Sequence, residues 1–536
     1  METQLKGFKQ FIAESRVDED VVNPIIDVLK AREKERTGIE RMPVFSDLVK
    51  TEDDKEYQYV NYVQEGGGVL GVALVGYTYV LEKLGIRFLK LAGTSAGAIN
   101  TMMLAAVDRK NYATAEKELN ETFTTQSEII LFELLNFRLW DLVDGSRFGK
   151  WLIGSAIKAS NHLKRFFKVL LFCLVFGLFS SLFFGILNMV EPSADGFWEG
   201  LRITVKLASI VAISSVLLLT FVMLITNYYL RRFAKASYGI NPGKAFHQWM
   251  KDVLQRNDIS NNQEMDAKIA ERCVGLRLSK ARLEKNYPGD NSAVISPYLT
   301  IIASDITNQT KVEFPLMAKE YWAEPDKVSP ADFVRASMSI PVFFEPFKVD
   351  VTQVLQRKNT DTTMKAFTDS QRSVEKKEVQ FVDGGILSNF PINVFHNPKI
   401  EWARMPTFGV KLEDKAHEKT DEKTTAMKKP KSSLLPFLGS ILSTIRFYYD
   451  RDFLKRNMVY ETCIAHIDVE GINWLDFGLD EATQKKLFLQ GARAAKTFFL
   501  GSELGGNFWM DGKEKPFKAY DWETFKEERR KVVLGG

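Results

Sequence analysis

The sequence predicts an α/β protein whose mainly parallel sheet is flanked by helices and interrupted by a two-helix transmembrane hairpin. The first observation is the order strand, glycine loop, helix, strand, sharp turn and helix over residues 57–106, which is typical of a parallel sheet. The second is the return of short apolar segments at 298–303 and 379–382, which indicate buried strands. The third is a pair of long uncharged segments, 169–190 and 207–230, between these two groups of strands.

These patterns divide the chain into five segments. Residues 1–56 are predicted to form an N-terminal helical appendage, and residues 57–150 the first part of the α/β domain. Residues 151–245 carry the hairpin, which interrupts that domain. Residues 246–410 form its second part, and residues 411–536 a charged loop and a C-terminal helical region.

Composition limits the range of functions. The 536 residues include 72 basic and 68 acidic side chains, a net charge of only +4, so no nucleic-acid partner is expected. The cysteines Cys173, Cys273 and Cys463 are too scattered for a disulfide framework or a metal site, which indicates a reducing compartment. The amino end lacks the apolar core of a secretion signal, so we expect it to stay in the cytosol.

The two uncharged segments, 169–190 and 207–230, are each long enough to cross a bilayer as a helix. A pair of buried core helices is the alternative, but core helices seldom stay uncharged for that length. Basic residues flank the outer ends of the pair: Lys158, Lys164, Arg165 and Lys168 before it, and Arg231, Arg232 and Lys235 after it. The positive-inside rule therefore predicts an integral membrane protein with both termini and the catalytic domain in the cytosol.

A candidate nucleophile lies in the segment Gly93-Thr94-Ser95-Ala96-Gly97. In a G-x-S-x-G turn between a strand and a helix the serine is held in a sharp reversal, and the glycines on either side avoid the clashes that Cβ atoms would make. Apolar residues before the turn and a helix-forming run after it supply the required context. Ser95 is therefore predicted to be the nucleophile of an acyl hydrolase.

A second glycine segment, beginning at Gly66, Gly67 and Gly68 and closed by Gly71, follows a predicted strand. Backbone N–H groups that no side chain covers can stabilise the oxyanion of a tetrahedral intermediate. The same glycines also fit G-x-G-x-x-G, the dinucleotide-binding pattern. That alternative expects an acidic residue at the end of the next strand, where this chain has Leu91-Ala92-Gly93-Thr94 instead.

The general base is predicted to be Asp383. Asp383 directly follows the apolar segment 379–382 and precedes Gly384 and Gly385. Open α/β sheets place their active sites at such carboxyl ends of strands. A turn-capping role for Asp383 is the alternative. The competing bases are the histidines, none of which is convincingly placed: His162, His247, His396, His417 and His466, the last being the strongest of them. Asp305 is a rival carboxylate that we expect to be structural.

These segments resemble the patatin-like phospholipase family, whose pattern joins a glycine-rich oxyanion loop, a G-x-S-x-G elbow and a D-G-G or D-G-A segment. Further similarity lies at residues 303–307, 334–344 and 389–391. The resemblance implies a Ser-Asp dyad formed by Ser95 and Asp383, an acyl-enzyme intermediate, and no metal or organic cofactor. It covers about 57–106 and 298–410, and so leaves the hairpin and both ends unexplained.

The expected function is therefore that of a membrane-anchored serine esterase acting on phospholipids or lysophospholipids. Many family members carry Arg or Lys in the oxyanion loop where this chain has Leu70. A leucine at this position resembles the loop of the animal triacylglycerol lipase branch of the family, so a neutral lipid is the nearest alternative substrate. From a different class of function, a catalytically inactive domain would serve as a membrane-bound scaffold for lipids or protein partners.

Overall fold

The computed structural model describes residues 2–112, 123–137, 238–360, 377–413 and 434–534, apart from 289, 291–293, 470, 475, 477, 502–506, 511–512 and 517–518, together with isolated positions between 203 and 231. The chain divides into two compact units. One contains Met1–Leu142 and Gly243–Gly536, and the other contains Val143–Pro242. The first unit contains Ser95, Asp383 and the glycine loop at 66–71.

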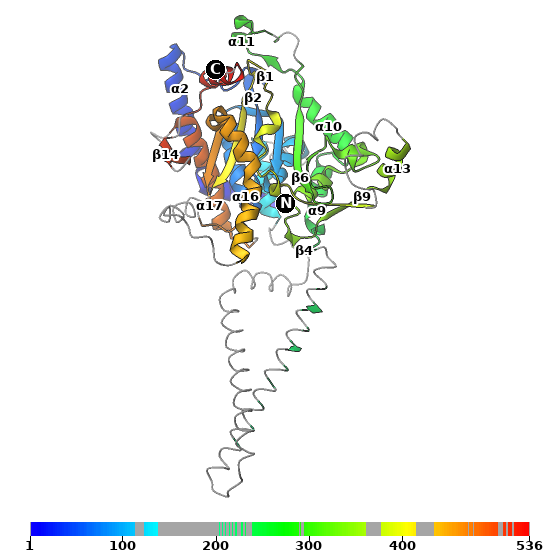
Figure 1. Ribbon diagram of the computed structural model, residues 1–536. Helices are drawn as coiled ribbons and strands as arrows, with labels where there is room; N and C mark the ends of the chain where they lie inside the picture. The colour runs from blue at the N-terminus through cyan, green and yellow to red at the C-terminus, as the bar shows by residue number, and fades with distance from the viewer. Residues whose placement is uncertain are drawn as a thin grey trace. The chain divides into compact units, whose positions relative to one another are not determined.

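A ten-stranded mixed sheet forms the centre of the first unit, and its main path runs β12-β11-β2-β3-β6-β10-β9 (Figure 1). The strands of this path are β2 (Lys55–Gln64), β3 (Ile86–Thr94), β6 (Tyr298–Asp305), β9 (Phe347–Asp350), β10 (Glu378–Asp383), β11 (Thr407–Glu413) and β12 (Ile464–Asp468). Three shorter strands extend it: β1 (Leu48–Glu52), β5 (Arg277–Leu278) and β7 (Thr310–Phe314).

Strand direction differs from the mainly parallel sheet predicted. The strands β12, β11, β2, β3 and β6 are parallel to one another. In contrast, β10 runs antiparallel to both β6 and β9, β7 returns antiparallel beside β6, and β1 pairs antiparallel with β2 and β5. The sheet is therefore mixed. Short connections join β1 to β2 and β6 to β7, whereas residues 351–377 separate β9 from β10.

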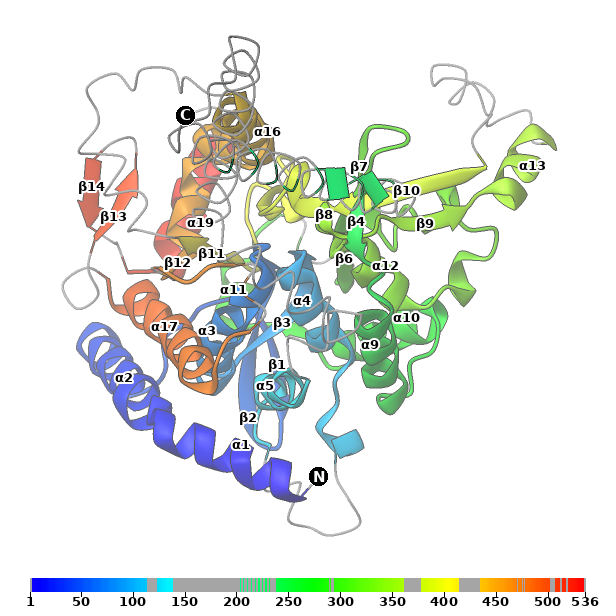
Figure 2. The same cartoon turned by 90° about the horizontal axis from the view of Figure 1, so that it is seen from below.

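Helices cover one face of the parallel strands. They include α3 (Gly71–Lys83), α4 (Ala96–Ala106), α5 (Gln126–Asn136) and α17 (Glu481–Leu500), and α17 lies beside α3 (Figure 2). Tyr62 of β2 meets α3, because its hydroxyl lies 2.9 Å from that of Thr78. Two glycines allow α3 and α17 to pack closely: a Cβ on Gly491 would lie 1.8 Å from the Ala73 carbonyl oxygen, and one on Gly76 would lie 2.0 Å from that of Phe488.

The remaining regular elements of the first unit are α1 (Glu2–Ser15), α2 (Asn23–Thr37), α9 (Lys244–Arg256), α10 (Asn262–Ala270), α11 (Lys280–Lys285), α12 (Pro330–Ser337), β8 (Val342–Phe344), α13 (Thr352–Thr360), α16 (Leu434–Arg456), β13 (Asn507–Met510), β14 (Lys513–Pro516) and α19 (Trp522–Val533). The N-terminal and C-terminal segments belong to this same unit. Phe8 of α1 packs on Phe123, and Arg32 of α2 donates to the Leu500 carbonyl at the end of α17.

The predicted hairpin falls almost entirely where the structure gives no description. Residues 169–190 lie outside the described residues, and only isolated positions of 207–230 are described. Within the described part of the chain, no helix combines the length and the apolar character needed to cross a bilayer.

Candidate active site

Ser95 occupies the sharp turn between β3 and α4. Its backbone has φ 55° and ψ −122°, a strained conformation for a residue with a side chain. The flanking glycines are required by space: a Cβ on Gly93 would lie 2.4 Å from the Gly97 carbonyl oxygen, and a Cβ on Gly97 would lie 2.4 Å from that of Gln64. The local geometry is that of a nucleophile elbow, with the serine at its apex.

The immediate partners of Ser95 come from the end of α12. The Ser95 N–H donates to Ser337 Oγ at 2.9 Å, and Ser95 Oγ lies 3.4 Å from the Met338 sulfur. The side chain is only 4% exposed. Backbone strain at such a residue persists only where surrounding contacts hold it, and the bond from Ser337 is one of those contacts.

Asp383 ends β10 at the level of the nucleophile turn. In the sheet, Asp383 pairs with Ala303 of β6, while Ile302 of β6 pairs with Thr94, the residue before Ser95. Gly384 lets the chain turn here, because a Cβ at that position would lie 2.2 Å from the Ile302 carbonyl oxygen. The structure therefore brings together the serine and the aspartate that the sequence analysis selected.

Asp383 is only 7% exposed, and one of its carboxyl oxygens accepts a backbone hydrogen bond. Oδ1 accepts the Gly385 N–H at 2.7 Å. Burial raises the pKa of Asp383, and the Ser95 hydroxyl, the Gly385 N–H and the Arg446 charge oppose that rise. The Ser95 hydroxyl is thus near, but it is not well aligned, since Oδ2 has no hydrogen-bond partner of good geometry in the described region. Such looseness is common in sites without substrate.

The glycine loop after β2 lies against the nucleophile. A Cβ on Gly66 would lie 3.0 Å from the Ser95 Cβ, and one on Gly67 would lie 2.1 Å from Leu412 Cδ1. The Gly66 N–H already donates to the Asn389 carbonyl at 3.0 Å, so it is committed to the loop's own structure. Of the three predicted oxyanion donors, Gly67 and Gly68 are the two whose N–H groups have no acceptor among the described residues.

Gly68 needs to be glycine for two reasons. Its φ is +56°, and a Cβ there would lie 2.3 Å from the Trp474 carbonyl oxygen. That carbonyl also accepts the Val69 N–H at 3.0 Å. At the other end of the loop, the Asn100 side chain of α4 donates to the Gly71 carbonyl at 2.9 Å, which ties the start of α3 to the elbow helix.

Three polar residues that sequence reasoning did not assign to the site support the glycine loop. Asn389 donates through Nδ2 to Glu65 Oε1 and to the Gly66 carbonyl, each at 3.1 Å. Arg446 of α16 donates through Nη2 to Asn389 Oδ1 at 2.9 Å. Asn389 lies in a segment that carried part of the family resemblance, which was the available signal. Arg446 and Glu65 carry no local motif.

The three histidines that the structure describes bond to residues other than Ser95. His247 lies 2.7 Å from Asp332, His396 lies 2.8 Å from Tyr460, and His466 contacts Glu413. Ser95 has no histidine partner in the part of the chain that the structure describes, and His162 and His417 lie outside that part.

Asp305 ends β6, three residues beyond Ile302, and its hydrogen bonds are with the turn that follows the strand and with Tyr321. It accepts the N–H groups of Thr307 and Asn308 at 2.8 and 2.9 Å, and the Tyr321 hydroxyl at 3.0 Å. These contacts give it the structural role expected of a turn-organising carboxylate. Within the described residues, no cluster of His, Cys, Asp or Glu has the arrangement of a metal site.

An apolar pocket opens beside Ser95. Its walls come from the glycine loop, α3, α4, α5, α9 and the end of α12: Gly68, Val69, Gly71, Val72, Ala96, Ile99, Asn100, Leu134, Phe137, Trp249 and Met338. Phe137 and Trp249 stack with their ring centroids 4.5 Å apart. The pocket presents almost only carbon and sulfur beside the nucleophile turn, but its volume is about 30 Å³, so its walls have to separate before an alkyl chain can enter.

Three comparisons relate this chain to known proteins. The model of the patatin-like phospholipase family matches residues 63–396. YqhO of Bacillus subtilis (strain 168), described as an uncharacterized protein, is 24% identical over 440 residues, which are 82% of this chain and 98% of YqhO. The crystal structure of VipD from Legionella pneumophila matches with a TM-score of 0.33 and 14% identity, over 87% of this chain and 72% of VipD. Since the family model spans more than half of the sequence, the chain belongs to the patatin-like phospholipase family.

Proposed function

We propose that this protein is a membrane-anchored serine hydrolase that cleaves carboxylic ester bonds of phospholipids or lysophospholipids through Ser95 and Asp383. The observation that supports it most is the meeting of three segments: the serine at the elbow, the buried carboxyl at the end of β10, and the glycine loop, where the Gly67 and Gly68 N–H groups have no acceptor among the described residues. Family membership supports lipid acyl hydrolysis in general.

In the first step the Asp383 carboxylate takes the Ser95 hydroxyl proton while Oγ bonds to the ester carbonyl carbon. The carbonyl oxygen becomes an oxyanion that the N–H groups of Gly67 and Gly68 stabilise. When the tetrahedral intermediate collapses, the bond to the alcohol breaks and Asp383 returns its proton to the leaving oxygen. Water then attacks the acyl-enzyme, again losing its proton to Asp383, and Ser95 regains its hydroxyl hydrogen as the fatty acid leaves.

Burial makes a carboxylate suitable for this task. In water a carboxylate is a weak base, but the raised pKa of Asp383 brings its proton affinity closer to what a general base needs. The apolar pocket beside Ser95 contributes by excluding water when an acyl chain fills it.

Arg446 favours a phospholipid over a neutral lipid. The glycine loop has Leu70 where a basic side chain would contact an anionic head group, but the half-buried guanidinium of Arg446 lies beside the same loop, bonded to Asn389. Its Nε is buried without a hydrogen-bond partner among described atoms. An arginine can bind phosphate through two nitrogens. Leu70 alone would instead suit a triacylglycerol, the second candidate.

The membrane anchor in this proposal rests on the two uncharged segments, 169–190 and 207–230. Anchoring would raise the effective concentration of a water-insoluble substrate at the catalytic domain. The expected result is that the full chain remains in the membrane fraction after an alkaline carbonate wash. Recovery of the chain in the wash supernatant would contradict the anchor without affecting the dyad.

A fluorophosphonate probe tests the nucleophile. The wild-type protein in lipid vesicles should be labelled, and Ser95→Ala should not be, because the probe bonds only to an activated serine hydroxyl. Absence of labelling in the wild type would instead support the scaffold hypothesis.

Product analysis on mixed phospholipid and triacylglycerol vesicles then identifies the substrate class. We expect Arg446→Met to lower kcat/KM on the phospholipid about tenfold or more while changing hydrolysis of an uncharged ester little. Arg451→Met on the same helix is the matched control, because both guanidinium groups lie over the Phe447 ring but the bond to Asn389 comes from Arg446. Equal losses on both substrates would mean that Arg446 only supports the loop.

A further inference from the structure

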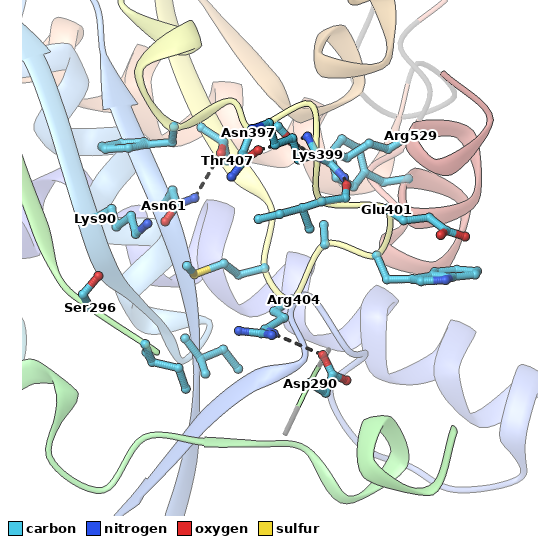
Figure 3. A pocket seen from close by; sticks show the side chains of 18 of the residues that line it. Asn61, Lys90, Asp290, Ser296, Asn397, Lys399, Glu401, Arg404, Thr407 and Arg529 are labelled. Atoms are coloured by element: carbon cyan, nitrogen blue, oxygen red, sulfur yellow. Dashed lines mark hydrogen bonds and ion pairs between the residues drawn. The ribbon is translucent and has the colours of Figure 1, made fainter. Parts of the chain in front are cut away.

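A second cavity, of about 570 Å³, lies on the other face of the sheet (Figure 3). Asn61 precedes Tyr62 on β2, and since Tyr62 meets α3, Asn61 faces away from that helix. The cavity lining includes neither Ser95 nor Asp383, nor any glycine of the oxyanion loop. Asn61 lies five residues before Gly66 of the glycine loop, and Lys90 lies five residues before Ser95. At about 3.3 Å per residue, each separation is roughly 16 Å along the strand. The cavity is therefore distinct from the candidate active site.

Three neighbouring strands present a polar row to this cavity. Thr407 of β11 pairs with Asn61 of β2, and Asn61 pairs with Lys90 of β3. The register shifts between Val60 and Asn61, whose partners are Phe88 and Lys90, so Leu89 is an extra residue in β3. Without that bulge, Lys90 would share a face with Phe88, which stacks on Tyr62 against the helices. The bulge therefore turns the lysine into the cavity beside Asn61.

The polar row has unused bonding capacity. The Lys90 ammonium has neither a hydrogen-bond acceptor nor an ion-pair partner among the residues that the structure describes, and burial lowers its pKa. Asn61 is 6% exposed and donates to Thr407 Oγ1 at 3.2 Å, but its Oδ1 is buried without a partner in the same described set. A buried carbonyl oxygen and a desolvated ammonium are both costly to leave unpaired, so this pair is suited to a ligand.

Charge in the cavity is positive because its acids are already neutralised. Asp290 bonds Arg282 at 2.7 Å and Arg404 at 3.1 Å, and Glu401 bonds Arg530 at 2.7 Å. Arg529, only 5% exposed, donates to the backbone carbonyls of Asn397 and Ile400 and meets no carboxylate within the described structure. The cavity thus favours an anion over a cation or a neutral molecule.

We propose that this cavity is a binding site for an organic phosphate that carries a hydroxyl group. The phosphate would bind the Lys90 ammonium, and the hydroxyl would donate to Asn61 Oδ1. Leu48, Ile295 and Met405 form an apolar wall in the same cavity, which would contact the carbon skeleton. This chemistry is shared by free polyol phosphates and by lysophospholipid head groups of the glycerol phosphate type.

Calorimetric titration of the full-length Ser95→Ala protein in detergent tests the site without turnover. The probes are glycerol 3-phosphate, 1-decanoyl-glycerol 3-phosphate, inorganic phosphate and the uncharged 1-decanoyl glycerol. We expect one or both organic phosphates to bind at least tenfold more tightly than inorganic phosphate and decanoyl glycerol. Tighter binding of the acylated probe would identify the ligand as a lysophospholipid. Equal binding of both organic phosphates would identify it as a free polyol phosphate. Failure of both to bind would overturn the proposal.

Lysine variants locate that binding. Lys90→Met should weaken it at least tenfold, Lys90→Arg should largely retain it, and Lys327→Met, at an exposed lysine paired with Glu324, should leave it unchanged. Unaltered affinity in Lys90→Met would contradict the assignment. The apo Lys90→Met protein should melt no lower than its parent, because the substitution removes an unpaired, half-buried charge.

A second measurement needs no Lys90 variant, so misfolding of a variant cannot affect its result. Both organic phosphates can be tested for protection of Lys90 from an amine-reactive ester, read by mass spectrometry of the same full-length protein. The phosphate that binds should protect Lys90 and leave Lys327 reactive. Equal labelling of Lys90 with and without that phosphate would place its binding elsewhere. None of these outcomes depends on whether Ser95 and Asp383 form a hydrolase.

Discussion

Asp383 lies level with Ser95, with the single strand β6 between them. Ile302 and Ala303, consecutive on β6, face Thr94 on one side and Asp383 on the other. Since β3 is parallel and β10 antiparallel to β6, the serine follows the end of one strand while the aspartate arrives at the same level from the opposite direction. This arrangement fixes the separation of the two side chains through the sheet itself rather than through flexible loops.

If Asp383 is the base, Asp383→Asn should lower phospholipid turnover about a thousandfold or more, because the amide cannot accept the serine proton. His466→Ala should retain most of the activity, since His466 contacts Glu413 rather than the nucleophile. Initial rates of both variants are the measurement. Wild-type activity should fall as the pH drops through the raised pKa of Asp383, where the base becomes protonated. Loss of activity in the histidine variant alone would restore a triad.

Alanine substitutions at two glycines with positive φ distinguish a catalytic role of the glycine loop from the general cost of backbone strain. Gly68→Ala places a methyl group where the Trp474 carbonyl lies 2.3 Å away, whereas Gly38, φ +77°, has nothing within 4 Å. We expect Gly68→Ala to reduce kcat about a hundredfold by displacing an oxyanion donor. Gly38→Ala should cost about 1 kcal/mol of stability and leave kcat unchanged. Steady-state kinetics and urea unfolding distinguish the two, and an active Gly68→Ala protein would remove that residue from the mechanism.

Asp450 of α16 should make stability depend on pH. It accepts the Ser388 hydroxyl and the Phe390 N–H, each at 2.8 Å, and burial raises its pKa to about 6. The folded state therefore binds the proton more tightly than the unfolded chain does. Proton binding at Asp450 stabilises the fold fully at pH values below the ordinary carboxyl pKa, and this stabilisation is lost as the pH rises through about 6. From pH 5 to 8 the loss is roughly 1 kcal/mol.

Urea unfolding of the wild type and Asp450→Asn at these two pH values checks that contribution. The asparagine cannot titrate, so the pH-dependent change in the free energy of unfolding should be smaller in the variant. An identical change in both proteins would show that Asp450 titrates alike in the folded and unfolded states.

Because α17 packs closely on α3, we expect alanine substitutions at two helical glycines to change the stability of the protein in opposite directions. Gly491→Ala would place its Cβ 1.8 Å from the Ala73 carbonyl oxygen, so we expect a loss of about 1–3 kcal/mol. Gly7→Ala in α1 meets nothing within 4 Å and should raise stability by up to about 1 kcal/mol through helix propensity. The difference in melting temperature between the two variants is the measurement, and equal melting temperatures would contradict the packing.

The local motifs of the site were predictable because their residues are neighbours in sequence. The elbow around Ser95 depends on glycines two positions away, and the oxyanion loop is a single glycine run. The position of Asp383 was predicted from the carboxyl-end rule for parallel strands, but β10 is antiparallel to β6, so Asp383 reaches the level of Ser95 by a different route from the one that rule assumes.

Residues that act through distant contacts escaped prediction. Arg446 reaches Asn389 across 57 positions, and no spacing rule connects them. The bulge that turns Lys90 toward Asn61 depends on the pairing of two strands, which an apolar pattern alone does not determine. The membrane hairpin remains a prediction from hydropathy.

The pairing of β11 with β2 has a practical consequence for producing this protein. The family match ends at residue 396, before β11, β12 and α17 begin. A fragment cut there would leave residues 61–64 of β2 without a strand partner on one side and would uncover the face of α3 that α17 occupies. Such a fragment should be insoluble, because the family match ends before the strands that complete this side of the sheet and the helix that covers α3.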